Sequence, residues 1–117
     1  MNKYLLLIKG DRGLTIPKMK AYEKKEVYRC WNLWVKQLKA EGLLVTASLL
    51  SSGGSAFYRS GKKENVPDNY EMASEVINGF CVLNVKSEET AMMIAKTCPI
   101  IRNDLASCEI REFKRTI

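Results

Sequence analysis

The order of the apolar segments along the chain leaves few folds open to it. Residues 3–9 form a short apolar run that stops at Gly10, as expected of a central strand buried on both faces. A long amphipathic helix, two strands joined as a hairpin, a strong strand, a second helix and a final strand follow. This order predicts an α+β domain of the ferredoxin-like βαββαβ type. Its antiparallel four-stranded sheet would carry two helices on one face.

The first helix is expected over residues 18–41. Pro17 suits a first helical turn, because its missing N–H is not needed there. Apolar residues recur along the segment at the spacing of one helix face. Trp31 and Trp34 lie on that face, which favours core or dimer packing over a stacking platform for bases. Gly42 then provides the left-handed residue that commonly ends a helix.

A hairpin is expected in the middle of the chain. The apolar run 43–50 would pair with a short strand at 56–60 across a turn of serines and glycines. Residues 61–74 are rich in turn-forming residues and predict a long loop, and loops of this length often carry function. The run 76–85 predicts a strong strand, with Gly79 at a point where a neighbouring group approaches closely.

The second helix is expected to begin after Ser87, a good N-cap, with two glutamates in its first turn. Small residues form its packing face, and Pro99 is expected to end it. Residues 107–113 supply the last strand. No repeat or linker interrupts the chain, so 1–117 is expected to be a single domain.

Composition excludes several classes of protein. Apolar residues make up 46% and charged residues 27% of the chain, which is typical of a globular protein and excludes general disorder. The chain has no histidine, and its four cysteines are widely spaced. We therefore expect no zinc site, other metal or cofactor. The cysteines are Cys30, Cys81, Cys98 and Cys108.

The first apolar run is shorter than the roughly 7–15 residues of a signal peptide's apolar region. No stretch approaches the ~20 apolar residues needed to cross a bilayer. We therefore expect a cytoplasmic protein, without membrane contact, whose thiols are free. Cys81 and Cys98 fall on apolar faces, which favours core packing over a nucleophilic role. Cys30 and Cys108 fit neither pattern, and the sequence leaves their redox state open.

The net charge of +6 raises the question of nucleic-acid binding. Basic residues gather in the first helix and near the C-terminus. Acidic residues are interspersed with them, however, and no RNP or helix-turn-helix motif is present. The sequence thus argues against nucleic acid as the partner.

The chain contains five short segments with a distinctive order and spacing: Lys3–Ile8, Gly42–Val45, Asn78–Leu83, Ala91–Pro99 and Glu109–Arg111. Taken together, they resemble the YCII-related (DGPF) family over nearly the whole chain. The resemblance implies a dimeric α/β barrel, in which the sheets of two subunits pack face to face. Layer packing supports the same expectation, since two helices cover only one face of a four-stranded sheet and a second copy could cover the other.

The family's Asp-Gly-Pro-Phe motif is only half present, as Pro67-Asp68-Asn69-Tyr70. Family members suspected of catalysis use a His–Asp pair in a cleft, and this chain has no histidine. In the corresponding segment the candidate catalytic residues are Asp68, Tyr70 and Glu75. Asp68 or Glu75 would act as the base and Tyr70 as a proton donor. The alternative is an ordinary turn aspartate beside a solvated glutamate.

Three further residues are candidates for binding a ligand: Asp11, Arg59 and Asn78. Arginine binds carboxylate or phosphate groups in bidentate fashion, so an anion could be held there; surface salt bridging is the alternative. The first hypothesis is a homodimer that binds a small anionic or phenolic molecule between the sheet and residues 61–74. The second is a non-enzymatic regulatory or protein-interaction module, and nucleic-acid binding is the weakest.

Overall fold

A computed structural model describes residues 2–10, 19–50, 54–65, 77–102 and 106–114. No helix in this part of the chain is long and apolar enough to cross a membrane. The elements are β1 (Asn2–Lys9), α2 (Ala21–Ala40), β2 (Leu44–Leu49), β3 (Ser55–Phe57), β4 (Lys63–Asn65), β5 (Ile77–Val85), α3 (Glu88–Lys96), α4 (Pro99–Arg102) and β6 (Ser107–Glu112).

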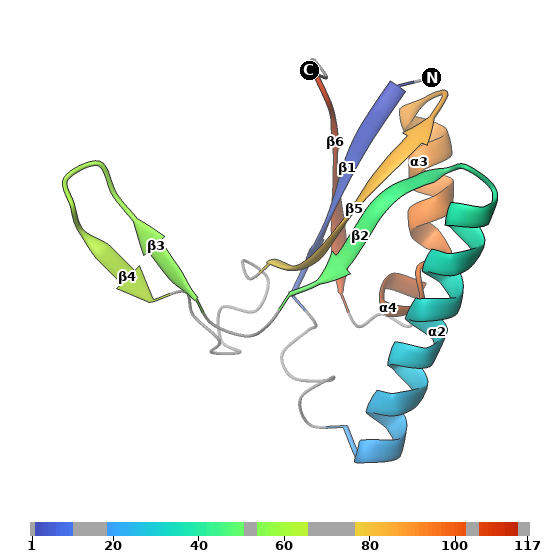
Figure 1. The fold of residues 1–117 in the computed structure, drawn as a ribbon, viewed down its shortest axis with the longest axis horizontal. Helices are drawn as coiled ribbons and strands as arrows, with labels where there is room; N and C mark the ends of the chain where they lie inside the picture. The colour runs from blue at the N-terminus through green and yellow to red at the C-terminus, as the bar shows by residue number, and fades with distance from the viewer. Residues whose placement is uncertain (1, 11–18, 51–53, 66–76, 103–105, 115–117) are drawn as a thin grey trace.

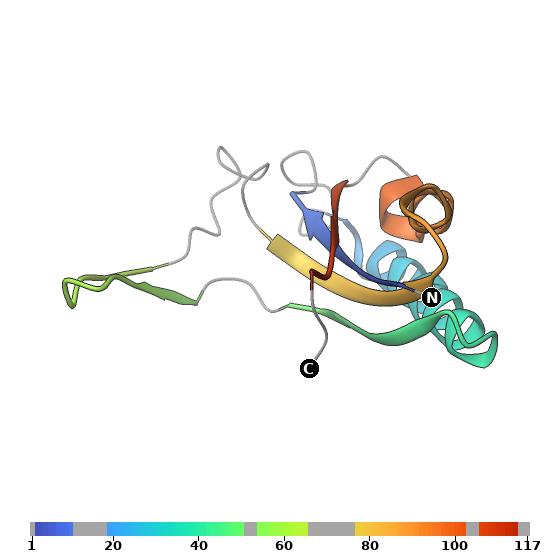
Figure 2. The same ribbon diagram turned by 90° about the horizontal axis from the view of Figure 1, so that it is seen from above.

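Four strands form one antiparallel sheet in the order β2-β5-β1-β6. The first and third of these strands in chain order, β1 and β5, are central, and the second and fourth, β2 and β6, lie at the edges. This arrangement is that of a ferredoxin-like fold, so the predicted fold class is confirmed. The helices α2, α3 and α4 lie on the same side of the sheet (Figures 1 and 2). Within one chain the sheet does not close into a barrel.

The hydrophobic core lies between the sheet and these helices. Alternate side chains of β1 and β5 point toward the helices and are almost wholly buried. Trp31 is 5% exposed within the same cluster, and Trp34 packs against it. The predicted core position of both tryptophans is therefore confirmed. The buried strand residues are Tyr4, Leu6, Ile8, Cys81, Leu83 and Val85.

Helix α2 begins at Ala21, later than the sequence predicted. Lys20 has an extended backbone, and its N–H donates to the Glu23 carboxylate at 3.1 Å. This bond satisfies a donor at the helix start and favours a beginning at this point. Pro17 lies outside the described residues. At the other end Gly42 has φ of 75°, which confirms its predicted left-handed role after the helix.

The predicted hairpin between residues 43–50 and 56–60 is wrong. Strand β3 pairs with β4, so that Phe57 lies opposite Lys63. Strand β2 pairs instead with β5. The nine-residue β5 offers β2 a long apolar partner, which a three-residue strand cannot match.

Residues 54–65 consequently form a separate two-stranded ribbon, which we call the arm. The arm projects from the sheet on the side away from the helices (Figures 1 and 2). Strand β4 occupies the first part of the segment predicted to be a loop, so that prediction is wrong for residues 63–65. Residues 66–74 lie outside the described part of the chain.

Gly79 confirms the predicted close approach of a neighbour. A Cβ atom there would lie 2.9 Å from the carbonyl oxygen of Ser48 and 3.0 Å from Cδ2 of Leu49. Any larger residue would therefore push strand β2 away from β5.

Helix α3 confirms the predicted N-cap and corrects its end. The Ser87 hydroxyl accepts a hydrogen bond from the N–H of Thr90 at 3.2 Å. The helix stops at Lys96, before Pro99. Pro99 instead begins the short helix α4, a position in which its missing N–H is not needed.

Candidate functional site

The sheet face turned away from the helices has an apolar centre. Leu5 and Leu7 of β1 lie beside Val82 and Phe80 of β5, and all four are only partly buried. No helix in the described part of the chain covers them (Figure 2). We call this surface the open face.

The pairing register places polar residues at both edges of the open face. One row across the sheet contains Ser48, Phe80, Leu7 and Glu109. The next row runs in the same way from a β2 hydroxyl to a β6 charge. Hydroxyl groups therefore border the apolar centre on one side and charged groups on the other. The second row contains Thr46, Val82, Leu5 and Arg111.

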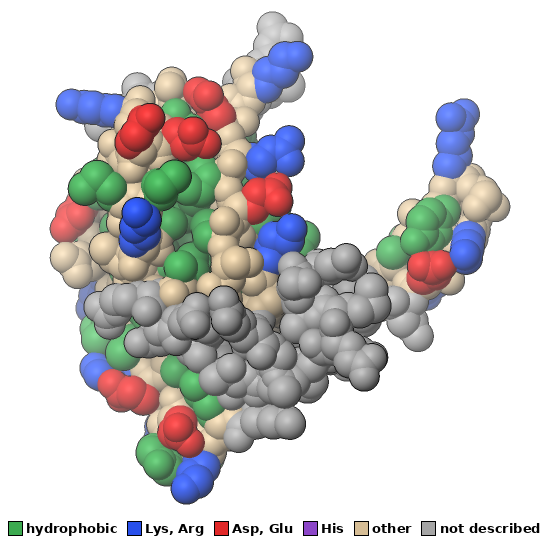
Figure 3. Space-filling model, turned by 180° about the vertical axis from the view of Figure 1, so that it is seen from behind, with side chains coloured by type: hydrophobic (Ala, Val, Ile, Leu, Met, Phe, Trp, Pro, Cys, Tyr) green, Lys and Arg blue, Asp and Glu red, His purple; other side chains and the backbone are tan. Residues whose placement is uncertain are grey.

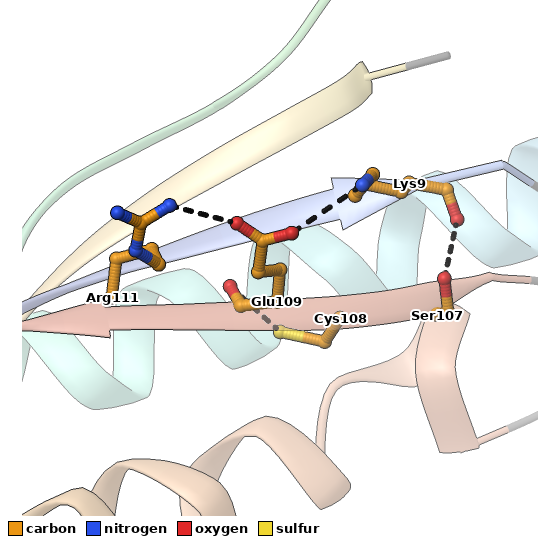
Figure 4. Close-up of polar contacts among 5 residues, drawn as sticks. All are labelled: Lys9, Ser107, Cys108, Glu109 and Arg111. Atoms are coloured by element: carbon orange, nitrogen blue, oxygen red, sulfur yellow. Dashed lines mark hydrogen bonds and ion pairs between the residues drawn. The ribbon is translucent and has the colours of Figure 1, made fainter. Parts of the chain in front are cut away.

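The charged edge is a connected group of three side chains, which we call the ionic strip. Lys9 Nζ lies 3.4 Å from Oε1 of Glu109, and a guanidinium nitrogen of Arg111 lies 3.3 Å from Oε2 (Figure 4). The strip has two cations for one anion. It therefore carries an excess positive charge, which favours an anionic ligand at this edge.

Hydrogen bonds from Arg111 and Lys9 hold the pKa of Glu109 below its ordinary value. Glu109 is thus ionised at neutral pH and is poorly suited to act as a general base. Ser107, the next outward-facing residue of β6, donates its hydroxyl to the carbonyl oxygen of Lys9 at 3.2 Å (Figure 4). This bond fixes the end of β6 against β1, and with it the position of the ionic strip.

Seen from behind, basic and acidic side chains alternate beside one another near the middle of the molecule (Figure 3). Hydrophobic side chains are also visible on this side and on the arm. The described side chains on this face are therefore mixed in charge rather than uniformly basic. Such mixing does not favour the long phosphate tracks of nucleic-acid binding.

The structure places two of the six candidate residues from the sequence. Asn78 lies at the register shift between β1 and β5, and its carbonyl oxygen accepts a hydrogen bond from the N–H of Leu50 at 2.8 Å. Arg59 is exposed in the turn that joins β3 to β4. It belongs to the arm, and the structure does not bring it beside Asn78 (Figure 1). The other four candidates, Asp11, Asp68, Tyr70 and Glu75, lie outside the described residues.

The ionic strip was not predicted from the sequence. Glu109 and Arg111 alternate with Cys108 and Ile110 along β6, which signals that the charges share one face. Their partner Lys9 is about a hundred residues away, however, and only the pairing of β6 with β1 reveals it.

Three of the four thiols, those of Cys81, Cys98 and Cys108, are poorly suited to act as nucleophiles. Cys81 and Cys98 are fully buried, as predicted, and burial raises the pKa of both. Burial also raises the pKa of Cys108 to about 11. All three are therefore protonated at neutral pH. Within the described residues, no three acidic, cysteine or histidine side chains are grouped to hold a metal ion.

Fold and site together define a ferredoxin-like domain whose open sheet face has an apolar centre and an ionic edge. The chain belongs to the YCII-related domain family, whose sequence model matches residues 3–114. The predicted family membership is therefore confirmed. No curated protein matches the chain.

Among solved structures, the chain is similar to 5-chloro-2-hydroxyhydroquinone dehydrochlorinase (TftG) from Burkholderia phenoliruptrix AC1100, in complex with 2,5-dihydroxybenzoquinone. The TM-score is 0.61, over 97% of this chain and 95% of that chain, with 11% sequence identity. A likeness at this level of identity shows a shared fold.

Proposed function

We propose that the protein is a cytoplasmic homodimer that binds a small anionic or phenolic molecule at the open face of its sheet. The observation that carries the proposal is the apolar centre of that face, bordered by the ionic strip. Small-molecule sites are commonly clefts lined by apolar side chains with a few placed polar groups. This face has that composition, and a second copy packed on it would enclose the ligand.

The open face suits a flat, polar ring. The Phe80 ring and the neighbouring leucines offer an apolar surface, while Lys9 and Arg111 can pair with an ionised hydroxyl or carboxylate. The ligand of the similar dehydrochlorinase, 2,5-dihydroxybenzoquinone, is a planar ring with acidic hydroxyls. It supports the proposed class of ligand and leaves its identity to experiment.

The second subunit belongs to the proposal because no helix in the described part of the chain covers the apolar centre of the open face. Partly exposed leucine, valine and phenylalanine side chains at the centre of a sheet are typically covered by another layer. A second copy would bring an equivalent face. The ligand would then be enclosed between two sheets.

The ligand test compares two arginines that both pair with a glutamate at the surface. Arg111 belongs to the ionic strip, whereas Arg29 pairs with Glu26 on the outer side of α2. Calorimetric titration with 2,5-dihydroxybenzoquinone and benzoate should give binding that weakens about tenfold in Arg111→Ala, the loss of one charged hydrogen bond of about 1.4 kcal/mol. Arg29→Ala should bind like the wild type. Absence of binding, or equal weakening in both variants, would overturn the site.

Ligand binding does not imply catalysis in this chain. The His–Asp pair of the suspected catalytic family members is incomplete, because the chain has no histidine. Asp68, Tyr70 and Glu75 remain the candidates. If a bound ring is turned over, Asp68→Ala and Tyr70→Phe should abolish turnover and leave the melting temperature unchanged. A fall in melting temperature with turnover retained would remove them from the mechanism.

A protein-interaction module is the second candidate function, and the arm is the observation that favours it. Its aromatic side chains are exposed, Phe57 by 75% and Tyr58 by 48%. Tyrosine and phenylalanine are enriched at protein–protein interfaces relative to the rest of a protein surface.

A further inference from the structure

We propose that the arm clasps the second copy of this chain. This inference rests on the proposed homodimer and adds an interaction surface to it. The arm projects on the same side of the sheet as the open face, opposite the helices (Figures 1 and 2). A second copy packed on the open face would therefore lie alongside the arm.

The length of the arm fits this role. From Gly54 to the turn at Ser60, extended chain at roughly 3.3 Å per residue spans about 20 Å. Sheets packed face to face are about 10 Å apart. The arm therefore reaches beyond the plane of a partner's sheet, to the flank of that subunit.

The two faces of the arm differ in how their polar groups are paired. On one face the Tyr58 hydroxyl donates to Glu64 at 2.8 Å, and Lys62 Nζ lies 2.8 Å from the same carboxylate. The hydrogen bond to Glu64 raises the pKa of Tyr58, so its hydroxyl stays protonated. These contacts fix the shape of the arm without using its other face.

The other face carries Phe57, opposite Lys63. The Lys63 ammonium lies 5.6 Å from the centre of the Phe57 ring, within range of a cation–π contact. The ring is nevertheless 75% exposed. The contacts on the opposite face hold the arm in a fixed shape, so the Phe57 ring is exposed from a rigid ribbon. Aromatic side chains are often among the residues that contribute most to binding energy at interfaces.

An isolated two-stranded ribbon is marginally stable in water. The arm pairs with no third strand in the described part of the chain. Contact with a partner would supply the missing cover. Its three basic residues against one acidic residue, Glu64, also favour a surface with acidic side chains. This chain presents such side chains at the start of α3, where Glu88 and Glu89 are exposed.

The test replaces Phe57 with the photoreactive p-benzoylphenylalanine in the full-length protein. Irradiation should give a covalent product of twice 13.3 kDa, and mass spectrometry should map the cross-link to the partner's chain in a mixture of isotopically light and heavy protein. The matched control places the same group at Tyr22, another exposed aromatic residue, which is 69% exposed on α2 and lies far in sequence from the glutamates of α3. The control should give no such product.

A second measurement uses sedimentation equilibrium. Phe57→Ser should raise the dimer dissociation constant at least tenfold, whereas Tyr22→Ser should leave it unchanged. If the wild type is a dimer but the Phe57 group cross-links only within its own chain, only to added oligonucleotide, or not at all, the clasp is overturned and the homodimer stands. If the wild type sediments as a monomer, the homodimer itself is overturned, and the clasp with it.

Discussion

At the scale of single residues, three cysteine side chains lie near one another in the core. Cys81 and Cys108 point inward from β5 and β6, and Cys98 lies just before α4. Burial is the main cause of the raised pKa of each thiol, and the nearby Cys98 raises the pKa of the other two further. In the folded protein these three thiols therefore stay protonated at pH values at which the thiols of an unfolded chain ionise.

This retention predicts a loss of stability in alkali. Cysteine in an unfolded chain ionises near pH 8.5, whereas Cys81 stays protonated in the folded protein well above that pH. Above about pH 9 the unfolded state binds fewer protons than the folded state, so the free energy of unfolding falls as the pH rises. Urea unfolding under reducing conditions at pH 8, 9 and 10 should show this fall. In Cys81→Ala the slope should be shallower by about 1.4 kcal/mol per pH unit. Equal slopes would contradict the prediction.

Burial of Cys81 and Cys98 was predictable because each lies among apolar neighbours in a periodic segment. The ionic strip was not, because nothing local in the sequence indicates which strand accepts β6. Glu109 meets Lys9 only after the chain has brought its two ends side by side. Of the six candidate residues, the structure places Asn78 near the start of the central strand β5 and Arg59 in the arm.

At the element scale, the sequence predicted the types of most elements and failed where pairing is non-local. Both long helices and the four main strands lie close to their predicted positions. The hairpin was assigned to the wrong partners because a short apolar run after a glycine turn favours local pairing. The longer β5, about thirty residues further on, pairs with β2 instead. Propensity indicates that a strand forms, whereas competition among all strands decides its partner.

Helix α3 offers a test of one local signal that was predicted correctly. Ser87→Ala removes the acceptor for the Thr90 N–H and should lower the free energy of unfolding by about 1 kcal/mol. For a chain of this length that corresponds to a fall in melting temperature of about 4 °C. Ser87→Asn keeps a side-chain acceptor and should unfold within a few tenths of a kcal/mol of the wild type. Calorimetry of the three proteins checks the prediction, and an equal loss in both variants would contradict a capping role.

On the scale of the whole molecule, the chain is more extended than one compact domain. Its radius of gyration is 15.2 Å, against about 13 Å expected for a compact chain of this length. The arm, which projects far from the rest of the molecule, contributes to the difference (Figure 2). An exposed arm and an uncovered apolar face on the same side of the sheet both favour assembly with a second copy.

Assembly predicts that thermal stability depends on protein concentration. When a folded dimer unfolds to two chains, each tenfold rise in concentration stabilises it by about 1.4 kcal/mol. With an unfolding entropy of roughly 0.5 kcal/mol/K for two such chains, the melting temperature should rise by about 3 °C per tenfold. Leu7→Glu places a charge at the centre of the open face and should abolish this dependence, while Leu33→Glu, at an exposed position of α2, should retain it. Scanning calorimetry over a hundredfold range of concentration measures both slopes. A constant melting temperature in the wild type would show that its open face is not covered by a second copy under those conditions, and would contradict the homodimer on which the enclosed ligand site depends.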